Sequence, residues 1–480
     1  MADNTTQTEE YVQLKLVINE ESNKVLFAEA GKDFVDILCS FLTMPLGTIA
    51  RLLQKDSNMG QITIGCLNSL YQSVVDLDKR YLWTDSIKEL LLKPKNSSED
   101  YCSTLKLNID DSQPTEYFIC ARNYFSSECR SCRNISKSTY YKCSCGSRFD
   151  RSFFLKRFCK GFVNSVATFV ITDDLINIIP NSAAYTTFSL LKNLGIITSS
   201  TKEMAVNVTK EKVVDLLKCA LVSKSPLTDV FLGKKPSIER SRFLTCNAEN
   251  SSTIQITIQL VIRKSEGNIL FAHGDQDFAD LLISFLTFPL GGIIRKLGEY
   301  SSMGSIGRLY KSIAESVENQ YFISEEAKNR LIDPLLASEY KSCSSILPIK
   351  EQCLNYYGYY QSESYRYRSN DPFFITDKHY KDGGRYEEMR LHNNKNPIKE
   401  GFVKGPRTYL ATDDLVIGPA SPISASLLIN RLQIPVDDLK EKNVTIGMKE
   451  CLSILNAALT STSALTNGLG HLLSEVMEEK

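Results

Sequence analysis

The strongest constraint on the fold of this chain is an internal repeat. Residues 33–47 read DFVDILCSFLTMPLG and residues 277–291 read DFADLLISFLTFPLG, so eleven of fifteen positions are identical at a constant offset of 244. A second string, GFVNSVATFVITDDL at 161–175, recurs as GFVKGPRTYLATDDL at 401–415. The strings keep the same order in both halves, which predicts two tandem copies of one unit. Such a duplication also accounts for a length of 480 residues, which exceeds one ordinary domain.

The repeat sets the expected domain boundaries. We expect a disordered N-terminus over 1–10, a first unit over 11–232, a linker over 233–252 and a second unit over 253–475. The linker is rich in Lys, Ser, Asn and Pro, a composition typical of connecting segments.

Each unit is predicted to begin with a β-hairpin. Residues 12–18 alternate apolar and polar side chains, and a polar break separates them from a second apolar run at 25–30. The second half repeats this pattern with Glu266 and Gly267 in the turn. With helical patterns following the hairpins, the sequence predicts an α+β fold in which strands and helices are segregated.

The strongest helical pattern follows the hairpin. Apolar residues spaced i, i+3, i+4 and i+7 follow Asp33 in the first half and Asp277 in the second, and both aspartates stand where an N-cap is expected. Pro45 and Pro289 are expected to end or restart the helix, because proline has no N–H to donate. Further helices are expected at 64–77, 84–92, 183–194 and 210–222.

A cysteine cluster distinguishes the first half from the second. Six of the 14 cysteines lie between residues 120 and 159, and the inner four read Cys-Arg-Ser-Cys and, ten residues later, Cys-Ser-Cys-Gly. Two close pairs on facing turns can surround a tetrahedral ion, as in a zinc ribbon, although the second pair is one residue shorter than the usual C-x-x-C. A knuckle without metal and a redox pair remain as alternatives. We therefore expect a knuckle insert over about 120–160 with a structural zinc held by Cys129, Cys132, Cys143 and Cys145, for which Cys120 or Cys159 are substitutes.

Charge is balanced overall and uneven locally. The 56 Lys and Arg match 56 Asp and Glu, which excludes nucleic-acid or membrane binding through bulk charge alone. Residues 121–160, however, hold ten Lys or Arg against two acids, with aromatic residues between them. We favour a role in balancing the negative charge of a zinc–thiolate centre, and nucleic acid or an acidic protein partner are the less favoured interpretations.

No compartment signal or catalytic motif is recognised. The start of the chain lacks the features of a secretory or transit peptide, and no apolar run reaches the roughly 18 residues of a membrane span. We therefore expect a cytoplasmic protein, with nuclear access left open and no membrane association. The chain has only four His, and its only recurring acid pairs are Asp173/Asp174 and Asp413/Asp414. Because adjacent strand residues point to opposite faces, a turn or helix cap is favoured over catalysis for these pairs.

The D-F-x-D-x-L-x-S-F-L-T-x-P-L-G string, the Leu-Tyr-x-Ser segment at 70–73, the cysteine knuckle and the Thr-Asp-Asp-Leu block resemble a plant-specific family known as domain of unknown function 674. The resemblance covers about 10–475 and implies a plant source and a tandem arrangement, but no known activity or ligand. We expect a non-enzymatic interaction or scaffold protein with an unidentified protein partner. A nucleic-acid-binding protein using the basic knuckle, and an enzyme using the Thr-Asp-Asp segments, are the alternatives; the oligomeric state is not predicted.

Overall fold

The fold is taken from a computed structural model of the chain. The structure describes residues 10–55, 59–60, 62–110, 113–120, 133–155, 161–165, 168–181, 192, 200–236, 254–298, 303–315, 321–340, 347, 349–350, 352, 355–360, 373–377, 379, 385–392 and 400–473. In these segments no helix combines the length and the apolar character needed to cross a membrane. Residues 1–9 of the expected N-terminal tail, almost all of the expected linker and nearly all of the helix expected at 183–194 lie outside the described residues.

Strands and helices are both abundant, so the predicted α+β class is confirmed. The strands are β1 Val12–Asn19, β2 Lys24–Ala30, β3 Glu116–Cys120, β4 Asn134–Ser136, β5 Phe149–Phe154, β6 Thr168–Thr172, β7 Ile178–Asn181, β8 Thr201–Val208, β9 Ile256–Arg263, β10 Asn268–Gly274, β11 Tyr356–Tyr360, β12 Phe373–Thr376, β13 Arg385–Leu391, β14 Tyr409–Thr412, β15 Ile417–Pro419 and β16 Leu439–Ile446. The helices are α1 Lys32–Thr43, α2 Leu46–Leu53, α3 Leu67–Asp76, α4 Asp85–Leu92, α5 Glu99–Cys102, α8 Lys210–Val222, α9 Pro226–Phe231, α10 Gln276–Ser284, α11 Leu290–Leu297, α12 Ile306–Glu315, α13 Glu325–Ile332, α14 Pro422–Arg431, α15 Met448–Thr460 and α16 Ala464–Leu469.

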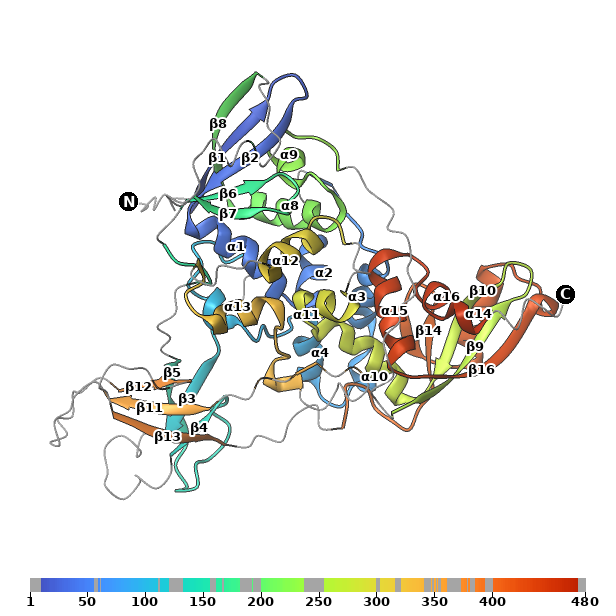
Figure 1. Ribbon diagram of the computed structural model, residues 1–480. Helices are drawn as coiled ribbons and strands as arrows, with labels where there is room; N and C mark the ends of the chain where they lie inside the picture. The colour runs from blue at the N-terminus through green and yellow to red at the C-terminus, as the bar shows by residue number, and fades with distance from the viewer. Residues whose placement is uncertain are drawn as a thin grey trace, which may run out of the picture.

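The first sheet has the strand order β7-β6-β2-β1-β8, and all neighbouring strands are antiparallel. The predicted hairpin is confirmed, because β1 pairs with β2 and every second side chain of β1 is buried. Helices α1, α8 and α9 lie beside this sheet (Figure 1). The helix expected at 210–222 is confirmed as α8.

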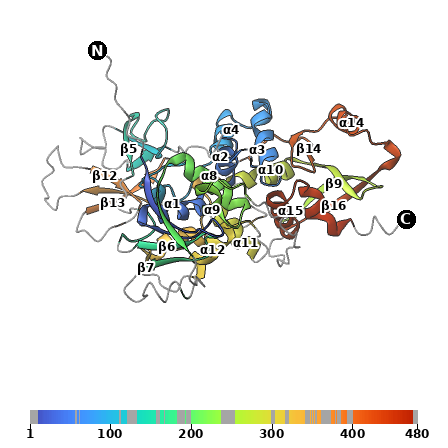
Figure 2. The same ribbon diagram turned by 90° about the horizontal axis from the view of Figure 1, so that it is seen from above.

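The second sheet has the order β15-β14-β10-β9-β16, again antiparallel throughout. Strands β9 and β10 begin 244 residues after β1 and β2. Figure 2 shows this sheet at the far end of the molecule from β5, β12 and β13, with helices between them.

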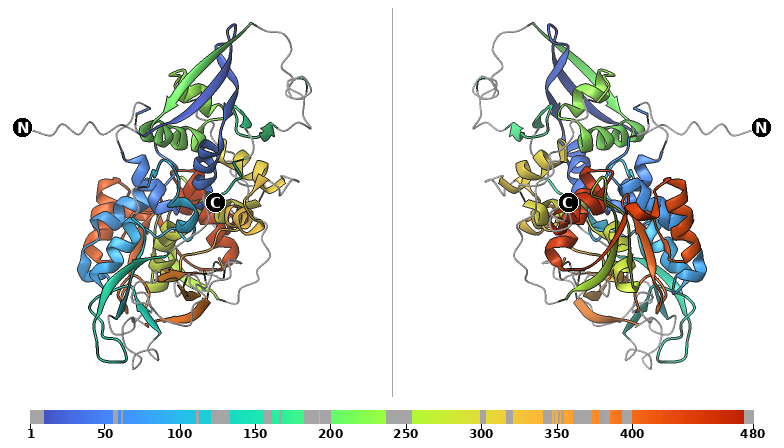
Figure 3. Two further views of the ribbon diagram at one scale, coloured as in Figure 1. Left: turned by 90° about the vertical axis from the view of Figure 1, so that its left-hand side faces the viewer. Right: turned by 90° about the vertical axis from the view of Figure 1, so that its right-hand side faces the viewer.

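A third, six-stranded sheet has the order β12-β11-β13-β4-β3-β5 and is built by both halves of the chain. Its two three-stranded parts join where β13 runs parallel to β4. Leu155, just after β5, forms a parallel bridge with Ile375 of β12, so the two edges of the sheet approach each other. They enclose a small apolar core of Tyr117, Ile119, Ile135, Tyr356, Ile375 and Met389. Figure 3 shows β3 and its neighbours on the side of the helices opposite the first sheet.

Reciprocal backbone hydrogen bonds join the two halves. Leu46 N–H donates to Phe288 O at 3.0 Å, and Leu290 N–H donates to Met44 O at 2.9 Å. Elsewhere, Cys66 N–H donates to Ala458 O and Ser305 N–H donates to Ala220 O, each at 2.8 Å. One continuous apolar core contains residues of both halves.

The N-caps of the first long helices differ from the prediction. Helix α1 is preceded by Gly31, and α10 by Asp275, whose side chain accepts hydrogen bonds from Asp277 and Phe278 N–H groups. Asp33 and Asp277 lie inside the first turn instead, so the N-cap prediction was wrong by two residues. The breaks at Pro45 and Pro289 are confirmed, since each proline immediately precedes a new helix.

Candidate metal centre

The cysteine knuckle is built on one end of the six-stranded sheet. Cys120 ends β3, and Cys143 and Cys145 lie in the turn between β4 and β5. That turn is closed by hydrogen bonds from Cys143 N–H to Ser147 O and from Gly146 N–H to Cys143 O, both 2.8 Å long. Gly146 adopts a φ of 82°, a conformation that glycine reaches without steric cost. The short C-x-C-G sequence therefore folds into a tight turn that carries two cysteines.

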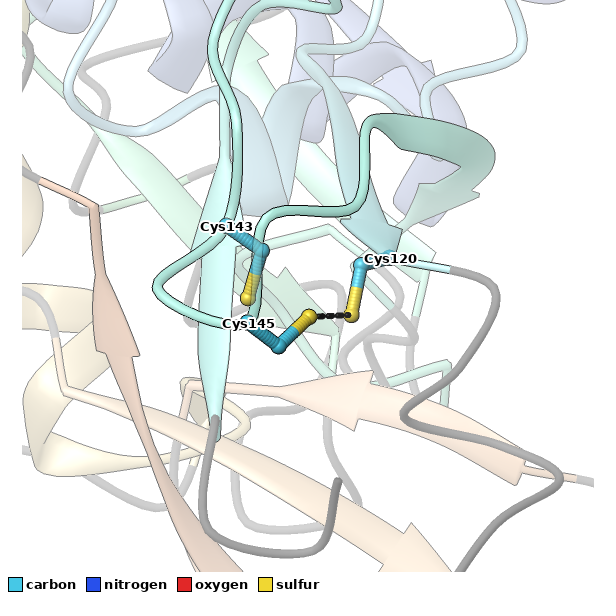
Figure 4. A group of neighbouring side chains, drawn as sticks. All are labelled: Cys120, Cys143 and Cys145. Atoms are coloured by element: carbon cyan, nitrogen blue, oxygen red, sulfur yellow. Dashed lines mark hydrogen bonds between the residues drawn. The ribbon is translucent and has the colours of Figure 1, made fainter. Parts of the chain in front are cut away.

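The three sulfur atoms converge. The Sγ atoms of Cys120 and Cys145 lie 3.8 Å apart, and those of Cys120, Cys143 and Cys145 all lie within 4.8 Å of one another (Figure 4). Zn–S bonds of about 2.3 Å in a tetrahedron place neighbouring sulfur atoms about 3.8 Å apart. The three thiols are therefore close enough to be ligands of one metal ion.

Apolar groups surround the cysteine group. Cys120, Cys143 and Phe149 are buried together, and Cys145 packs against them half-buried. The ring of Phe149 lies 5.4 Å from that of His392, which directly follows β13. The second half of the chain therefore closes one side of the knuckle, and the apolar shell limits access of water to the sulfur atoms.

Two of the four ligands expected from the sequence belong to this group. Cys143 and Cys145 are brought together as expected, but their described partner is Cys120, which the sequence offered only as a substitute. Cys129, Cys132 and Cys159 lie outside the described residues. The signal for Cys120 was its place at the end of a strand directly before the cluster.

The basic side chains around the knuckle have different environments. Lys137 Nζ lies 2.5 Å from Glu339 Oε1, in a half-buried ion pair between the two halves of the chain. Burial alone would lower the pKa of Lys137, but the Glu339 carboxylate raises it above its usual value. The ammonium group of Lys137 therefore pairs with Glu339 inside the protein. By contrast, the guanidinium of Arg151 lies over the Phe153 ring at 5.4 Å, and Tyr140 is 94% exposed.

The paired aspartates of the Thr-Asp-Asp segments diverge. Asp173 accepts hydrogen bonds from Thr228 N–H at 2.8 Å and Thr228 Oγ1 at 2.6 Å, which ties β6 to α9. Asp174 turns back to Thr172 Oγ1 at 2.7 Å. Burial raises the pKa of Asp173, and its hydrogen bonds to Thr228 offset part of that effect. Asp174 is a local acceptor, as expected for a turn, whereas Thr228, the partner of Asp173, lies 55 residues further along the chain.

The same arrangement occurs in the second half. Asp413 accepts hydrogen bonds from Thr466 N–H at 2.7 Å and Thr466 Oγ1 at 2.9 Å, and Asp414 accepts one from Thr412 Oγ1 at 2.5 Å. Each Thr-Asp-Asp segment therefore connects its sheet to the short helix near the end of its half.

A buried aspartate with no role predicted from the sequence anchors the repeated helix. Asp36 Oδ1 accepts hydrogen bonds from Phe162 N–H at 2.6 Å and Val163 N–H at 2.9 Å. Asp280 makes the same bonds to Phe402 and Val403 at 3.0 and 2.9 Å. The signal was present, because both the D-F-x-D and the G-F-V strings recur in each half.

The described fold and site thus define a mixed α+β protein with a cysteine group placed for a metal. The family model described as "Protein of unknown function (DUF674)" matches residues 8–449, and the chain belongs to this family. No curated protein and no solved structure shows significant similarity to the chain.

Proposed function

We propose that this chain is a non-enzymatic interaction protein of plants, built from two paired copies of one unit, and that its knuckle holds a structural zinc ion. The observation that carries the zinc assignment is the convergence of the Cys120, Cys143 and Cys145 sulfur atoms. A cysteine of the segment 121–132, which contains Cys129 and Cys132, would complete four thiolates. Such a site has no open position for substrate or water, which suits a structural role.

The contacts between the halves support the pairing. Met44 and Phe288, and likewise Leu46 and Leu290, are related by the offset of 244, and each segment donates one hydrogen bond to the other. Reciprocal contacts of related positions are what a twofold axis produces. The duplicated units would therefore act as an internal dimer, with the knuckle on the six-stranded sheet that both halves build.

The internal use of the Thr-Asp-Asp aspartates supports a binding role over catalysis. Asp173 and Asp413 hold α9 and α16 against their sheets. These carboxylates, on which the enzyme alternative depends, therefore stabilise the fold.

Cobalt substitution tests the zinc site. Tetrahedral thiolate coordination of Co²⁺ gives intense charge-transfer bands in the near ultraviolet and strong d–d bands, which we expect on adding Co²⁺ to the metal-free protein and which Cys143→Ser should remove. Weak d–d bands typical of octahedral oxygen coordination would contradict the proposal. The matched control Cys102→Ser changes a cysteine outside the knuckle and should leave the spectrum unchanged.

Partner capture from plant extract, with and without nuclease, tests the interaction role. We expect the wild type to retain partner proteins even after nuclease treatment. The Cys143→Ser variant should no longer retain them. The second candidate, a nucleic-acid-binding protein, is favoured by the exposed aromatic side chains Tyr140 and Phe154 and by the stacking of Arg151 over the Phe153 ring. Nuclease-sensitive retention, weakened by salt and by replacing Lys142 and Arg151, would favour that candidate instead.

A further inference from the structure

Each half of the chain contributes one loop that pairs with a short segment of the other half. Val403 forms an antiparallel bridge with Leu82, and Val163 forms one with Phe322; we call these the Leu82 bridge and the Val163 bridge. Both pairs are related by an offset of 240 residues, so they occupy corresponding places in the repeated sequence. In Figures 1 and 2, α10 lies beside α4, which begins soon after Leu82.

The same backbone hydrogen bonds hold both bridges. In the Leu82 bridge, Trp83 N–H donates to Phe402 O at 3.2 Å, and Lys404 N–H donates to Tyr81 O at 2.8 Å. The corresponding bonds of the Val163 bridge run from Ile323 N–H to Phe162 O at 3.0 Å and from Asn164 N–H to Tyr321 O at 2.8 Å. Tyr81 also lines an open cleft of about 640 Å³ between α3 and β15, so the Leu82 bridge borders that cleft.

A buried aspartate of the repeated helix holds the loop of each bridge, Asp36 in the first half and Asp280 in the second. At Asp36 a cation completes the contact. Lys32 Nζ lies 2.5 Å from Asp36 Oδ2 and 2.6 Å from Val163 O. One ammonium group therefore neutralises the carboxylate and binds the loop of the Val163 bridge directly.

The second half lacks this cation. Gln276 stands at the position that corresponds to Lys32, and its Nε2 donates to Glu400 O at 2.6 Å. Among the described residues no Lys or Arg pairs with Asp280, and the neighbouring charge of Asp277 on the same helix opposes its ionisation. The carboxyl group that holds the Leu82 bridge is thus buried without a counter-charge.

The other titratable and charged groups around Asp280 do not take over the role of the missing cation. The Tyr409 hydroxyl donates to Lys404 O at 2.8 Å, and burial raises the pKa of Tyr409 to about 12, so this phenol stays neutral. The guanidinium of Arg407 lies over the Tyr81 ring at 4.9 Å. The Asp280 carboxyl is therefore the group at this bridge whose charge changes near neutral pH.

Ionisation of a buried carboxyl group without a cation favours conformations that expose it to water. Burial raises the pKa of Asp280 to about 7, whereas at Asp36 the ammonium group of Lys32 opposes the rise in pKa that burial causes. In an open, hydrated loop the pKa of Asp280 returns toward 3.8. Asp280 therefore stabilises the closed bridge fully below about pH 4 and progressively less as the pH rises to about 7.

We propose that the Leu82 bridge is a proton-controlled contact between the two halves, closed while Asp280 is protonated and opening as Asp280 ionises. The Val163 bridge stays closed over the same pH range, because Lys32 neutralises Asp36. This inference rests on the sequence repeat and is independent of the zinc and interaction roles.

Amide hydrogen exchange of the full chain at pH 5 and pH 7, corrected for the pH dependence of intrinsic exchange, tests the proposal. The reporters are the N–H groups that hold each bridge: Trp83 and Lys404 for the Leu82 bridge, and Asn164 and Ile323 for the Val163 bridge. We expect the opening constant of the Leu82 bridge to rise at least about tenfold from pH 5 to pH 7, and that of the Val163 bridge to change less than about threefold.

Exchanging the two side chains between the halves gives matched variants. Gln276→Lys supplies the cation that Asp280 lacks and should reduce the rise at the Leu82 bridge to less than about threefold. Lys32→Gln should give the Val163 bridge a similar pH dependence. Asp280→Asn, which cannot titrate, should show no rise at the Leu82 bridge.

The comparison of the two bridges within the wild type needs no variant, and thermal melting identifies any variant that does not fold. Equal responses of the two bridges to pH, or no rise at the Leu82 bridge, would overturn the proposal. An unchanged rise in folded Gln276→Lys or Asp280→Asn would do the same.

Discussion

Asp280 offers the sharpest prediction on stability. Its buried carboxyl group lies on α10 and accepts hydrogen bonds from Phe402 and Val403 N–H groups. Burial raises the pKa of Asp280 from 3.8 to about 7, and the hydrogen bonds offset only part of this effect. In Asp280→Asn the amide oxygen keeps an acceptor for both N–H groups, but the side chain no longer titrates.

The sign and size of the effect follow from the shifted pKa. Because the folded chain binds this proton more tightly than the unfolded chain, the carboxyl group contributes its full stabilisation only below about pH 4. That contribution falls as the pH rises and is lost above the folded-state pKa of about 7. Between pH 5 and pH 8 the loss amounts to about 3 kcal/mol, at 1.36 kcal/mol for each pH unit up to the folded-state pKa.

Urea unfolding of the wild type and Asp280→Asn between pH 5 and pH 8 measures this loss. We expect the free energy of unfolding of the variant, relative to the wild type, to rise by about 3 kcal/mol from pH 5 to pH 8. Burial also raises the pKa of Asp36, Asp173 and Asp413, but these groups titrate in both proteins and cancel in the comparison. A difference that stays constant over this pH range would refute the reasoning.

Two further predictions concern packing and charge. A Cβ at Gly161, where φ is 71°, would lie 2.0 Å from Asp36 Oδ2, so Gly161→Ala should cost about 3 kcal/mol in urea unfolding. The control Gly146→Ala has a φ of 82° but open space around it and should cost only about 1–2 kcal/mol; equal losses would contradict the anchoring role of Asp36. Lys137→Met leaves Glu339 half-buried without its partner and should cost about 2–3 kcal/mol, less than a fully buried pair. Adding Glu339→Leu should recover most of that loss, and a double variant as unstable as the single one would speak against the ion pair.

Features governed by local sequence were predictable. The alternation at 12–18 identified β1, and the apolar period at 210–222 identified α8, because each pattern depends on residues close together in the chain. The six-stranded sheet was not predictable, because Arg390 pairs with Asn134 across most of the chain and no local pattern records that partner.

The sequence predicted the type of site, a cysteine cluster, but not the complete set of cysteines that come together. Spacing placed Cys143 and Cys145 in one turn, but only the folding of β3 against β5 brings Cys120 to them. Similarly, the N–H groups that bind Asp36 lie more than a hundred residues away in the chain, so no local pattern identifies them.

Elemental analysis of the purified chain tests the zinc proposal most directly. The wild type, purified without added metal, should contain about one zinc ion per chain, as expected for a four-thiolate structural site. Cys120→Ser should lose most of this zinc, while Cys102→Ser should keep it. Less than about 0.3 zinc per wild-type chain, or a zinc content unaffected by Cys120→Ser, would contradict the proposed centre.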